Sequence, residues 1–149
     1  METVRAGHVR RFGDLEVRVL HPFRDFARIR PEEQYDATVV VKLTYGATSI
    51  LLAGDLDVAQ EAALLRHDRA ALKVSHHGSK NGTTPAFLEA VHPEIAVISV
   101  GRENRYGHPS SEIIDRLRAT GVAVRRTDEH GAVTLTSDGI AVRVDVEQD

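Results

Sequence analysis

Two apolar stretches of the chain each run into residues that can bind a metal ion. Leu-Leu-Ala-Gly-Asp at residues 51–55 ends in the carboxylate of Asp55, and Leu-Lys-Val-Ser at residues 72–75 is followed by His76 and His77. A buried strand that stops at such a residue brings it to the carboxyl edge of a sheet, where loops leave room for a ligand. Oxygen and imidazole ligands together suit zinc, manganese or iron better than calcium or magnesium. We therefore expect Asp55, His76 and His77 to lie in one crevice, although three ligands are too few for two metal ions.

A third motif, Ile-Ser-Val-Gly-Arg-Glu-Asn-Arg-Tyr-Gly-His-Pro-Ser at residues 98–110, follows the first two at close spacing. With Leu-Leu-Ala-Gly-Asp and Leu-Lys-Val-Ser-His-His-Gly-Ser-Lys before it, the chain resembles the metallo-β-lactamase-like domain of ComEC-type DNA-internalisation competence proteins, from about Leu15 to Ile140. The resemblance implies an αββα sandwich. It also implies hydrolysis of a DNA phosphodiester by a hydroxide that bridges two metal ions, zinc or manganese. The partner that the resemblance implies is DNA, bound as a single strand or recognised through its phosphodiester.

The resemblance implies that one half of that domain is not contained in this sequence. The superfamily carries its main ligand motif, His-x-His-x-Asp-His or a close variant, ahead of the Gly-Asp strand, and none of the eight histidines begins such a run. We therefore interpret residues 1–149 as the second half of a two-half domain, and we expect the isolated chain to show little or no hydrolysis. The missing partner would be the absent first half or a second copy of the chain, covering the apolar sheet face that a lone half exposes.

The resemblance assigns roles to individual residues. Asp55 would bridge the two cations, and one of His76 and His77 would be the late histidine ligand; we favour His77, because it lies nearer the turn at Gly78. Neighbouring residues on an extended strand point to opposite sides, so the other ring could hydrogen-bond a substrate phosphate or the ligating imidazole. From the residues alone, Asp55 could instead cap the following helix, although Asp57 is also placed for that role.

Polar residues of the third motif could bind a phosphodiester next to the metal ligands. Guanidinium forks and an imidazole donor suit phosphate oxygens, and the loop before the Ser110 helix offers both. A well-packed connection, in which His-Pro sets the start of that helix, is an equally good interpretation. The predicted substrate-binding residues are Ser79, Lys80, Arg102, Asn104, Arg105 and Tyr106, with His108 as a further catalytic candidate.

Composition limits the class of protein. The 149 residues suffice for one domain with a core, and the absence of cysteine excludes disulfides and thiolate metal sites. No apolar stretch reaches the roughly 20 residues that cross a bilayer, and no secretory signal follows Met1. The membrane segments of a ComEC-type protein would lie outside this chain, which would be a soluble domain of a membrane-associated bacterial protein. A formal charge of −3 argues against a broad basic face for duplex DNA.

The expected elements form a mixed sheet with helices on one face, an α/β (α+β) half-sandwich. Alternating β-branched residues and turn signals predict strands over residues 16–20, 38–43, 49–53, 72–74, 95–100, 122–126, 132–136 and 140–146. Helices are expected from Asp57, over residues 86–91, and after residue 110. We expect Gln60 to complete a capping box with Asp57, and the buried stripe of that helix to comprise Val58, Ala62 and Leu65. Residues 23–34 should form a loop or one short helix.

Two further functions stay open at this stage. The scaffold could serve as a non-catalytic nucleic-acid-binding or assembly module, or as a small-ester hydrolase of the same superfamily. His21, which precedes Pro22, stands where related domains sometimes place another ligand, although His-Pro also commonly just ends a strand. Substituting Asp55 and His77 would abolish the activity of an enzyme but leave a module intact.

Overall fold

A seven-stranded mixed sheet forms the centre of the computed structural model, which describes residues 3–24, 36–64 and 71–147. The strands follow one another across the sheet in chain order. The first four form an antiparallel meander, and the last three run parallel to the fourth. They are β1 (Val9–Phe12), β2 (Leu15–His21), β3 (Val40–Tyr45), β4 (Thr48–Leu52), β5 (Ala71–Lys73), β6 (Ile95–Ile98) and β7 (Ala123–Arg126).

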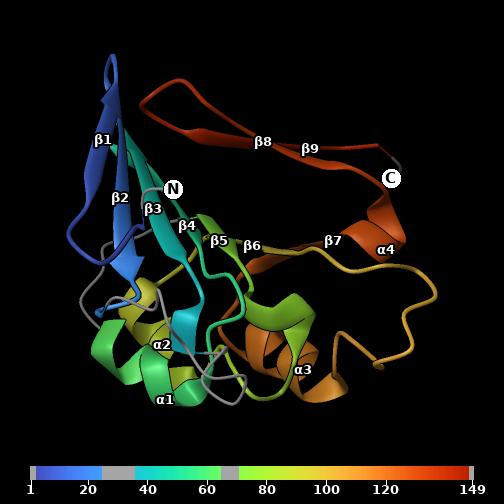
Figure 1. Cartoon of the computed structure of the whole chain (residues 1–149). Helices are drawn as coiled ribbons and strands as arrows, with labels where there is room; N and C mark the ends of the chain where they lie inside the picture. The colour runs from blue at the N-terminus through green and yellow to red at the C-terminus, as the bar shows by residue number, and fades with distance from the viewer. Residues whose placement is uncertain (1–2, 25–35, 65–70, 148–149) are drawn as a thin grey trace.

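Helical segments make the crossovers between the parallel strands and cover one face of the sheet (Figure 1). Parallel neighbours need such crossovers, because a tight turn places the next strand antiparallel to the one before it. The chain must instead return to the end of the sheet at which the first strand began. Between β4 and β7 these segments are α1 (Val58–Glu61), η2 (Ala62–Leu64), η3 (Ser75–Gly78), α2 (Pro85–Val91) and α3 (Ser111–Ala119). The predicted mixed sheet with helices on one face is confirmed.

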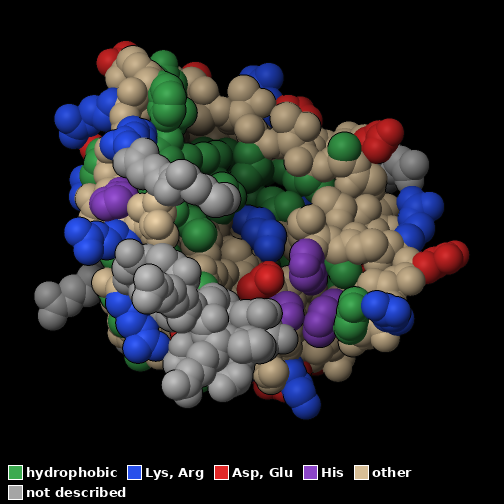
Figure 2. Space-filling view, viewed as in Figure 1, with side chains coloured by type: hydrophobic (Ala, Val, Ile, Leu, Met, Phe, Trp, Pro, Cys, Tyr) green, Lys and Arg blue, Asp and Glu red, His purple; other side chains and the backbone are tan. Residues whose placement is uncertain are grey.

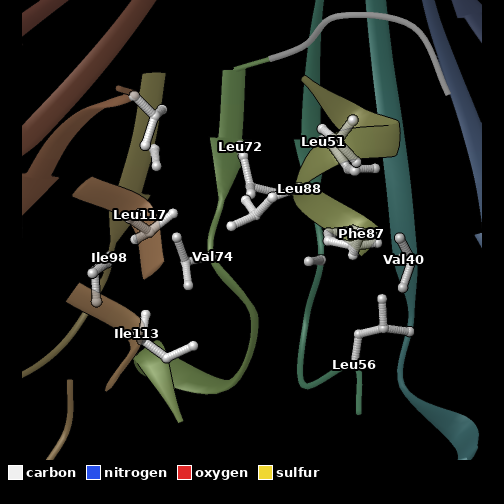
Figure 3. Packing of buried hydrophobic residues seen from close by; sticks show 14 of the residues in the cluster. Val40, Leu51, Leu56, Leu72, Val74, Phe87, Leu88, Ile98, Ile113 and Leu117 are labelled. Atoms are coloured by element: carbon white, nitrogen blue, oxygen red, sulfur yellow. The ribbon is translucent and has the colours of Figure 1, made fainter. Parts of the chain in front are cut away.

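The core lies between this helical layer and the sheet. Figure 3 shows Phe87 and Leu88 of α2 packed towards strand residues such as Leu51 and Leu72, all almost fully buried. Burying side chains of this size contributes roughly 1.5–3 kcal/mol each, which is the main force holding the helices to the sheet. Successive side chains of a strand point to opposite faces of the sheet, so the strand residues next to these core residues lie on the face away from the helices.

The helix starts follow the predicted capping residues. Thr84 Oγ1 accepts from Phe87 N at 3.2 Å, with Pro85 in the first turn of α2. Asp57 caps α1 by accepting from Val58 N at 2.6 Å. Ser110 is likewise the N-cap residue of α3.

The predicted capping box and buried stripe of the first helix are wrong. Gln60 Nε2 donates to Asp36 Oδ1 at 2.5 Å and does not return to the cap. The helix is a single turn, so its inward positions differ from those of a longer helix: Val58 is 47% exposed and Ala62 is exposed, whereas Glu61 is buried. Leu65 lies outside the described residues, as does most of the segment 23–34.

A β-hairpin lies across the face of the sheet that the helices leave open. It comprises β8 (Val133–Ser137) and β9 (Val142–Val146) and follows a one-turn helix, α4 (Thr127–His130), which the sequence patterns did not predict. Strand β1 was not predicted either. The tip of the hairpin is fixed to the β3–β4 turn, where Ala47 N donates to Gly139 O at 2.7 Å and Thr48 Oγ1 lies 2.6 Å from Ser137 Oγ.

The hairpin leaves part of this open face uncovered. A groove of about 230 Å³ between sheet and hairpin is lined mainly by Leu15, Leu43 and Ile50, which are half-buried. Figure 2 shows hydrophobic side chains at the bottom of a hollow beneath the hairpin. The predicted apolar face is therefore present, with one hairpin across it. Among the described helices, none is long and apolar enough to cross a membrane.

Candidate functional site

Asp55 lies just beyond the carboxyl end of β4, on a turn that requires glycine before it. Gly54 has a φ of 57°, and a Cβ there would lie 2.7 Å from Thr38 Oγ1 and 2.8 Å from Val39 O. The same hydroxyl accepts a hydrogen bond from Asp55 N at 2.9 Å. The Asp55 residue is exposed, and Asp57 occupies the N-cap position of the helix. The structure thus leaves the Asp55 carboxylate at the sheet edge without a capping role.

The histidine pair occupies a left-handed turn and not an extended strand. Strand β5 ends at Lys73, and the φ angles are 43° at His76, 54° at His77 and 81° at Gly78. Our expectation that the two rings alternate along a strand is therefore wrong. A non-glycine residue in this region costs about 1–3 kcal/mol, and such residues concentrate at functional sites. Two consecutive histidines in this conformation mark the turn as a candidate site.

Hydrogen bonds join this turn to the other two motifs. His76 N donates to Gly54 O at 2.9 Å, which holds the turn against the residue before Asp55. Ser110 N donates to Gly78 O at 3.0 Å, at the end of the third motif. Gly78 is required by packing as well, because a Cβ there would lie 2.6 Å from Cβ of Pro109. The structure therefore brings the Gly-Asp, His-His-Gly and Gly-His-Pro motifs to one edge of the sheet.

Three imidazole rings gather at this edge. The ring centroids of His76 and His108 are 5.8 Å apart, and those of His76 and His77 are 6.5 Å apart. Burial lowers the pKa of His108, and electrostatic repulsion from the neighbouring His76 and His77 lowers it further. His108 is therefore held towards its neutral form, in which one ring nitrogen can accept a proton, a hydrogen bond or a metal ion. Histidine side chains lie together, next to acidic and basic ones, in Figure 2.

The His77 ring has the orientation that a metal-binding histidine commonly has. Its Nδ1–H donates to the Ser99 carbonyl at 2.6 Å, so the lone pair of the neutral ring is on Nε2. Metal-ligating histidines almost always donate their second nitrogen in this way, which fixes the tautomer and the ring orientation. His77 is also exposed. These features agree with our preference for His77, whose role stays a prediction.

Lys73 is a residue of the site that the sequence did not single out. Strand alternation places Lys73 with Leu52 and Val97 on the open face, since its neighbour Leu72 lies in the core. Burial lowers the pKa of the Lys73 ammonium, and the charge of Asp55 acts in the opposite direction. A basic group therefore stands beside the carboxylate. A signal was present, because Lys73 interrupts an otherwise apolar strand at the position that faces away from the helices.

The predicted substrate-binding residues divide into two groups. Asn104 holds its own loop: Nδ2 donates to Gly101 O at 3.0 Å and to His108 O at 2.6 Å, while Oδ1 accepts from His108 N at 2.9 Å. Ser79 is buried, and its hydroxyl accepts from Asn81 N at 3.3 Å. Arg102 Nε donates to Asp128 O at 3.0 Å. Lys80, Arg105 and Tyr106 form the other group and are exposed, as Arg102 is too.

Two buried residues support the site from behind. His21 donates through Nδ1–H to Thr38 O at 2.8 Å, and Thr38 is the residue that holds Asp55 N. Glu61, only 1% exposed, accepts from the backbone N–H groups of Thr83 and Thr84, the second at 2.9 Å. The sequence patterns did not single out Glu61, because a glutamate in a short surface helix is usually solvated.

Within the parts of the chain that the structure describes, no group of three or more His, Cys, Asp or Glu side chains is arranged to hold a metal ion. The donor chemistry is suitable, because a carboxylate and imidazoles meet at one edge. Whether these residues bind a metal ion stays a prediction.

Comparison with known proteins supports the resemblance seen in the three motifs. The chain is 33% identical over 137 residues to ComE operon protein 3 of Bacillus subtilis, covering 89% of this chain and 17% of that protein. It is 35% identical over 119 residues to the competence protein ComA of Neisseria gonorrhoeae, covering 73% of this chain and 17% of that protein. It is 35% identical over 98 residues to Recombination protein 2 of Haemophilus influenzae, covering 64% and 12%. The chain thus spans about one sixth or less of these relatives.

The fold also has a relative among solved structures. A Parabacteroides distasonis protein assigned to the metal-dependent hydrolases matches with a TM-score of 0.53 and 16% identity, over 85% of this chain and 57% of that one. At this identity the match shows a shared fold alone. No family model matches the chain. The sequence relatives and the fold together identify the chain as related to the metallo-β-lactamase-like domain of ComEC-type competence proteins.

Proposed function

We propose that the chain is the second half of a metal-dependent hydrolase domain that cleaves a phosphodiester of DNA during uptake. The observation that carries the proposal is the hydrogen bond of 2.9 Å from His76 N to Gly54 O, which fixes the histidine turn beside Asp55. Two consecutive non-glycine residues with left-handed φ, next to an exposed aspartate, are the kind of strained backbone that concentrates at functional sites. The competence proteins named above supply the DNA context.

Asp55 and His77 would be the metal ligands that this chain contributes, with His76 and His108 beside them. His77 is suited to this role by its bond to Ser99 O, which directs Nε2 away from the backbone. A bound pair of zinc or manganese ions would lower the pKa of a bridging water and stabilise negative charge on the phosphoryl oxygens. The remaining ligands would come from the absent first half.

The open face of the sheet is where that first half would dock. Leu15, Leu43 and Ile50 line a groove there that the hairpin leaves accessible, and Lys73 stands on the same face next to Asp55. A second layer packed on this face would exclude water from the groove and bring its own ligands to the edge at which Asp55 lies. In that complex the Lys73 ammonium would offset the charge of a bound phosphodiester.

The test compares the 149-residue chain with the same chain joined to the first half of the domain. With Mn²⁺ or Zn²⁺, we expect the joined protein to hydrolyse bis(p-nitrophenyl) phosphate or single-stranded DNA and the chain alone to show little or no turnover. In the joined protein, Asp55→Asn and His77→Asn should each abolish hydrolysis. His92→Asn is the matched control, because His92 is also an exposed histidine with left-handed φ (47°). Turnover by the chain alone would contradict the half-domain proposal.

A non-catalytic nucleic-acid-binding or assembly module is the second candidate. The observation behind it is that the described residues contain no group of three or more His, Cys, Asp or Glu side chains that could hold a metal ion. If Asp55→Asn and His77→Asn leave the function of the joined protein intact, the module is the better description. A small-ester hydrolase would instead be indicated by turnover of lactones or thioesters in place of phosphodiesters.

A further inference from the structure

Tyr106 is an aromatic side chain held in solvent next to the candidate site. The residue is 69% exposed, although aromatic rings normally contribute to folding by being buried. Its ring stacks on His108, with the centroids 6.2 Å apart and the planes inclined by 19°. His108 in turn contacts His76 edge-on. The rings of His76, His108 and Tyr106 therefore form a series that leads outwards from the histidine turn.

The loop that carries Tyr106 is fixed on both sides of the ring. The Asn104 amide makes three hydrogen bonds within the loop, two of them to the backbone of His108. Thr127 Oγ1 lies 2.8 Å from both the N–H and the carbonyl oxygen of Val100, just before the loop. The position of Tyr106 is thus set in advance of any ligand, which reduces the entropy lost when a ligand stacks on it.

The surroundings of the ring suit a polyanion with aromatic groups. The Arg105 guanidinium carbon lies 5.3 Å from the Tyr106 ring centroid, and Nη2 donates to the tyrosine hydroxyl at 3.2 Å. Lys80, in the loop after the histidine turn, is exposed. One acidic residue, Glu103, is exposed in the loop that carries Tyr106. A cation beside an exposed aromatic ring is the combination with which proteins bind single-stranded nucleic acid.

We propose that Tyr106 is a stacking platform for an unpaired nucleobase, so that the site takes single-stranded nucleic acid and not duplex. This inference rests on the proposed function. The strand whose base stacks on Tyr106 would be the one whose phosphodiester is hydrolysed at the histidines. A base inside a duplex has both faces covered by the adjacent base pairs and is not available to stack on a side chain. The platform therefore selects a strand whose bases are free.

The test measures binding without hydrolysis. A short single-stranded oligodeoxynucleotide with one 2-aminopurine is titrated with the 149-residue chain in EDTA, and stacking is read as quenching of the 2-aminopurine fluorescence. Tyr106→Leu should weaken binding about tenfold and abolish the quenching, since one base–aromatic stack is worth about 1–3 kcal/mol. Tyr106→Phe, which keeps the ring, should bind within about twofold of the wild type.

The matched control is Phe12→Leu. Phe12 is 67% exposed but lies at the end of β1, and the antiparallel pairing of β1 with β2 places it at the sheet edge opposite His21 and the site. This substitution should leave both binding and quenching unchanged. A chemical control is an oligonucleotide with abasic sites, which has no base to stack. The affinity of the wild type for this strand should be no higher than the affinity of Tyr106→Leu for the intact strand.

Three results would overturn the inference: equal binding of intact and abasic strands, which means phosphate contact alone; unchanged quenching in Tyr106→Leu; or no binding of any strand by the wild type. None of them depends on hydrolysis, because EDTA removes the metal ions. Failure of the proposed function would instead be seen as absent turnover in the joined protein. The two failures are therefore distinguishable.

Discussion

Replacing Glu61 by glutamine tests whether a buried carboxylate holds the loop behind the histidine turn. The two carboxylate oxygens accept from Thr83 N and Thr84 N, and Arg116 Nη1 donates to Gly82 O and Thr83 O at 3.0 and 2.8 Å. Glutamine has the same shape but keeps a single acceptor oxygen. Its NH₂ group would face one of the backbone N–H groups, leaving a buried donor unsatisfied.

The magnitude follows from these two bonds. A hydrogen bond to a charged group contributes about 1.5–3 kcal/mol against about 0.5–1.5 for a neutral one, and an unsatisfied buried donor costs about 1–3 kcal/mol. The smaller desolvation of a neutral amide offsets part of this loss. We expect Glu61→Gln to lower the free energy of unfolding by about 2 kcal/mol, a large share of the 5–15 kcal/mol typical of a domain. The corresponding fall in Tm is roughly 4–8 °C.

Urea unfolding followed by circular dichroism measures this loss, and amide hydrogen exchange locates it. Protection should fall first at Thr83 and Thr84. Glu89→Gln is the control, because Glu89 is exposed on α2 and the substitution should change stability by less than about 0.5 kcal/mol. If Glu61→Gln is as stable as the wild type, with Thr83 and Thr84 equally protected, then the carboxylate does not hold the loop.

Three further predictions concern the conformation of the backbone and the hydrogen bonds that its N–H groups make. Gly78→Ala should destabilise the chain by about 2–3 kcal/mol, and Gly107→Ala by only about 1 kcal/mol, because both need positive φ but only the first would meet a neighbouring atom; equal losses in thermal unfolding would refute this. Thr38→Val should cost about 1 kcal/mol and speed hydrogen exchange at Asp55 N, whose acceptor it removes, and unchanged exchange would count against that role. Hydrogen bonds from the N–H groups of residues 141 and 140 lower the pKa of Asp138. Its stabilising effect is thus present above the unfolded pKa of about 3.9 and is lost as pH falls through the folded pKa; a carboxyl titration by NMR that shows no downward shift would contradict this.

Much of the fold could be predicted because it depends on local chemistry. The caps Thr84 and Ser110, the turn glycines and the alternation of β-branched residues determine the elements within one or two residues. The one-turn helix after Asp57 was expected to be longer, because a capping pattern shows where a helix starts but not how soon tertiary contacts end it. Strand β1 was not expected, since Val9 is the only residue of the strand that is not exposed.

The site was harder to predict because it depends on contacts between distant residues. The motifs showed that Asp55 and the histidine pair belong at one edge, and the structure places their backbones in contact. The conformation of the pair could not be foreseen: a sequence records that Gly78 tolerates a positive φ, but not that His76 and His77 share it. The bond from His77 to Ser99 spans 22 residues and has no local signal.

The strain in the histidine turn is balanced by these distant contacts. Two non-glycine residues with positive φ cost about 2–6 kcal/mol together, and no local hydrogen bond of ordinary strength offsets so much. The backbone bonds to Gly54 and from Ser110, together with the His77 side-chain bond to Ser99, contribute about 0.5–1.5 kcal/mol each, which is of the same order. These contacts come from the two other motifs of the site: Gly54 belongs to the first, and Ser99 and Ser110 belong to the third. The left-handed turn is therefore stable only when the Gly-Asp and Gly-His-Pro loops are in place, so that formation of the histidine turn and assembly of the whole sheet edge are one event.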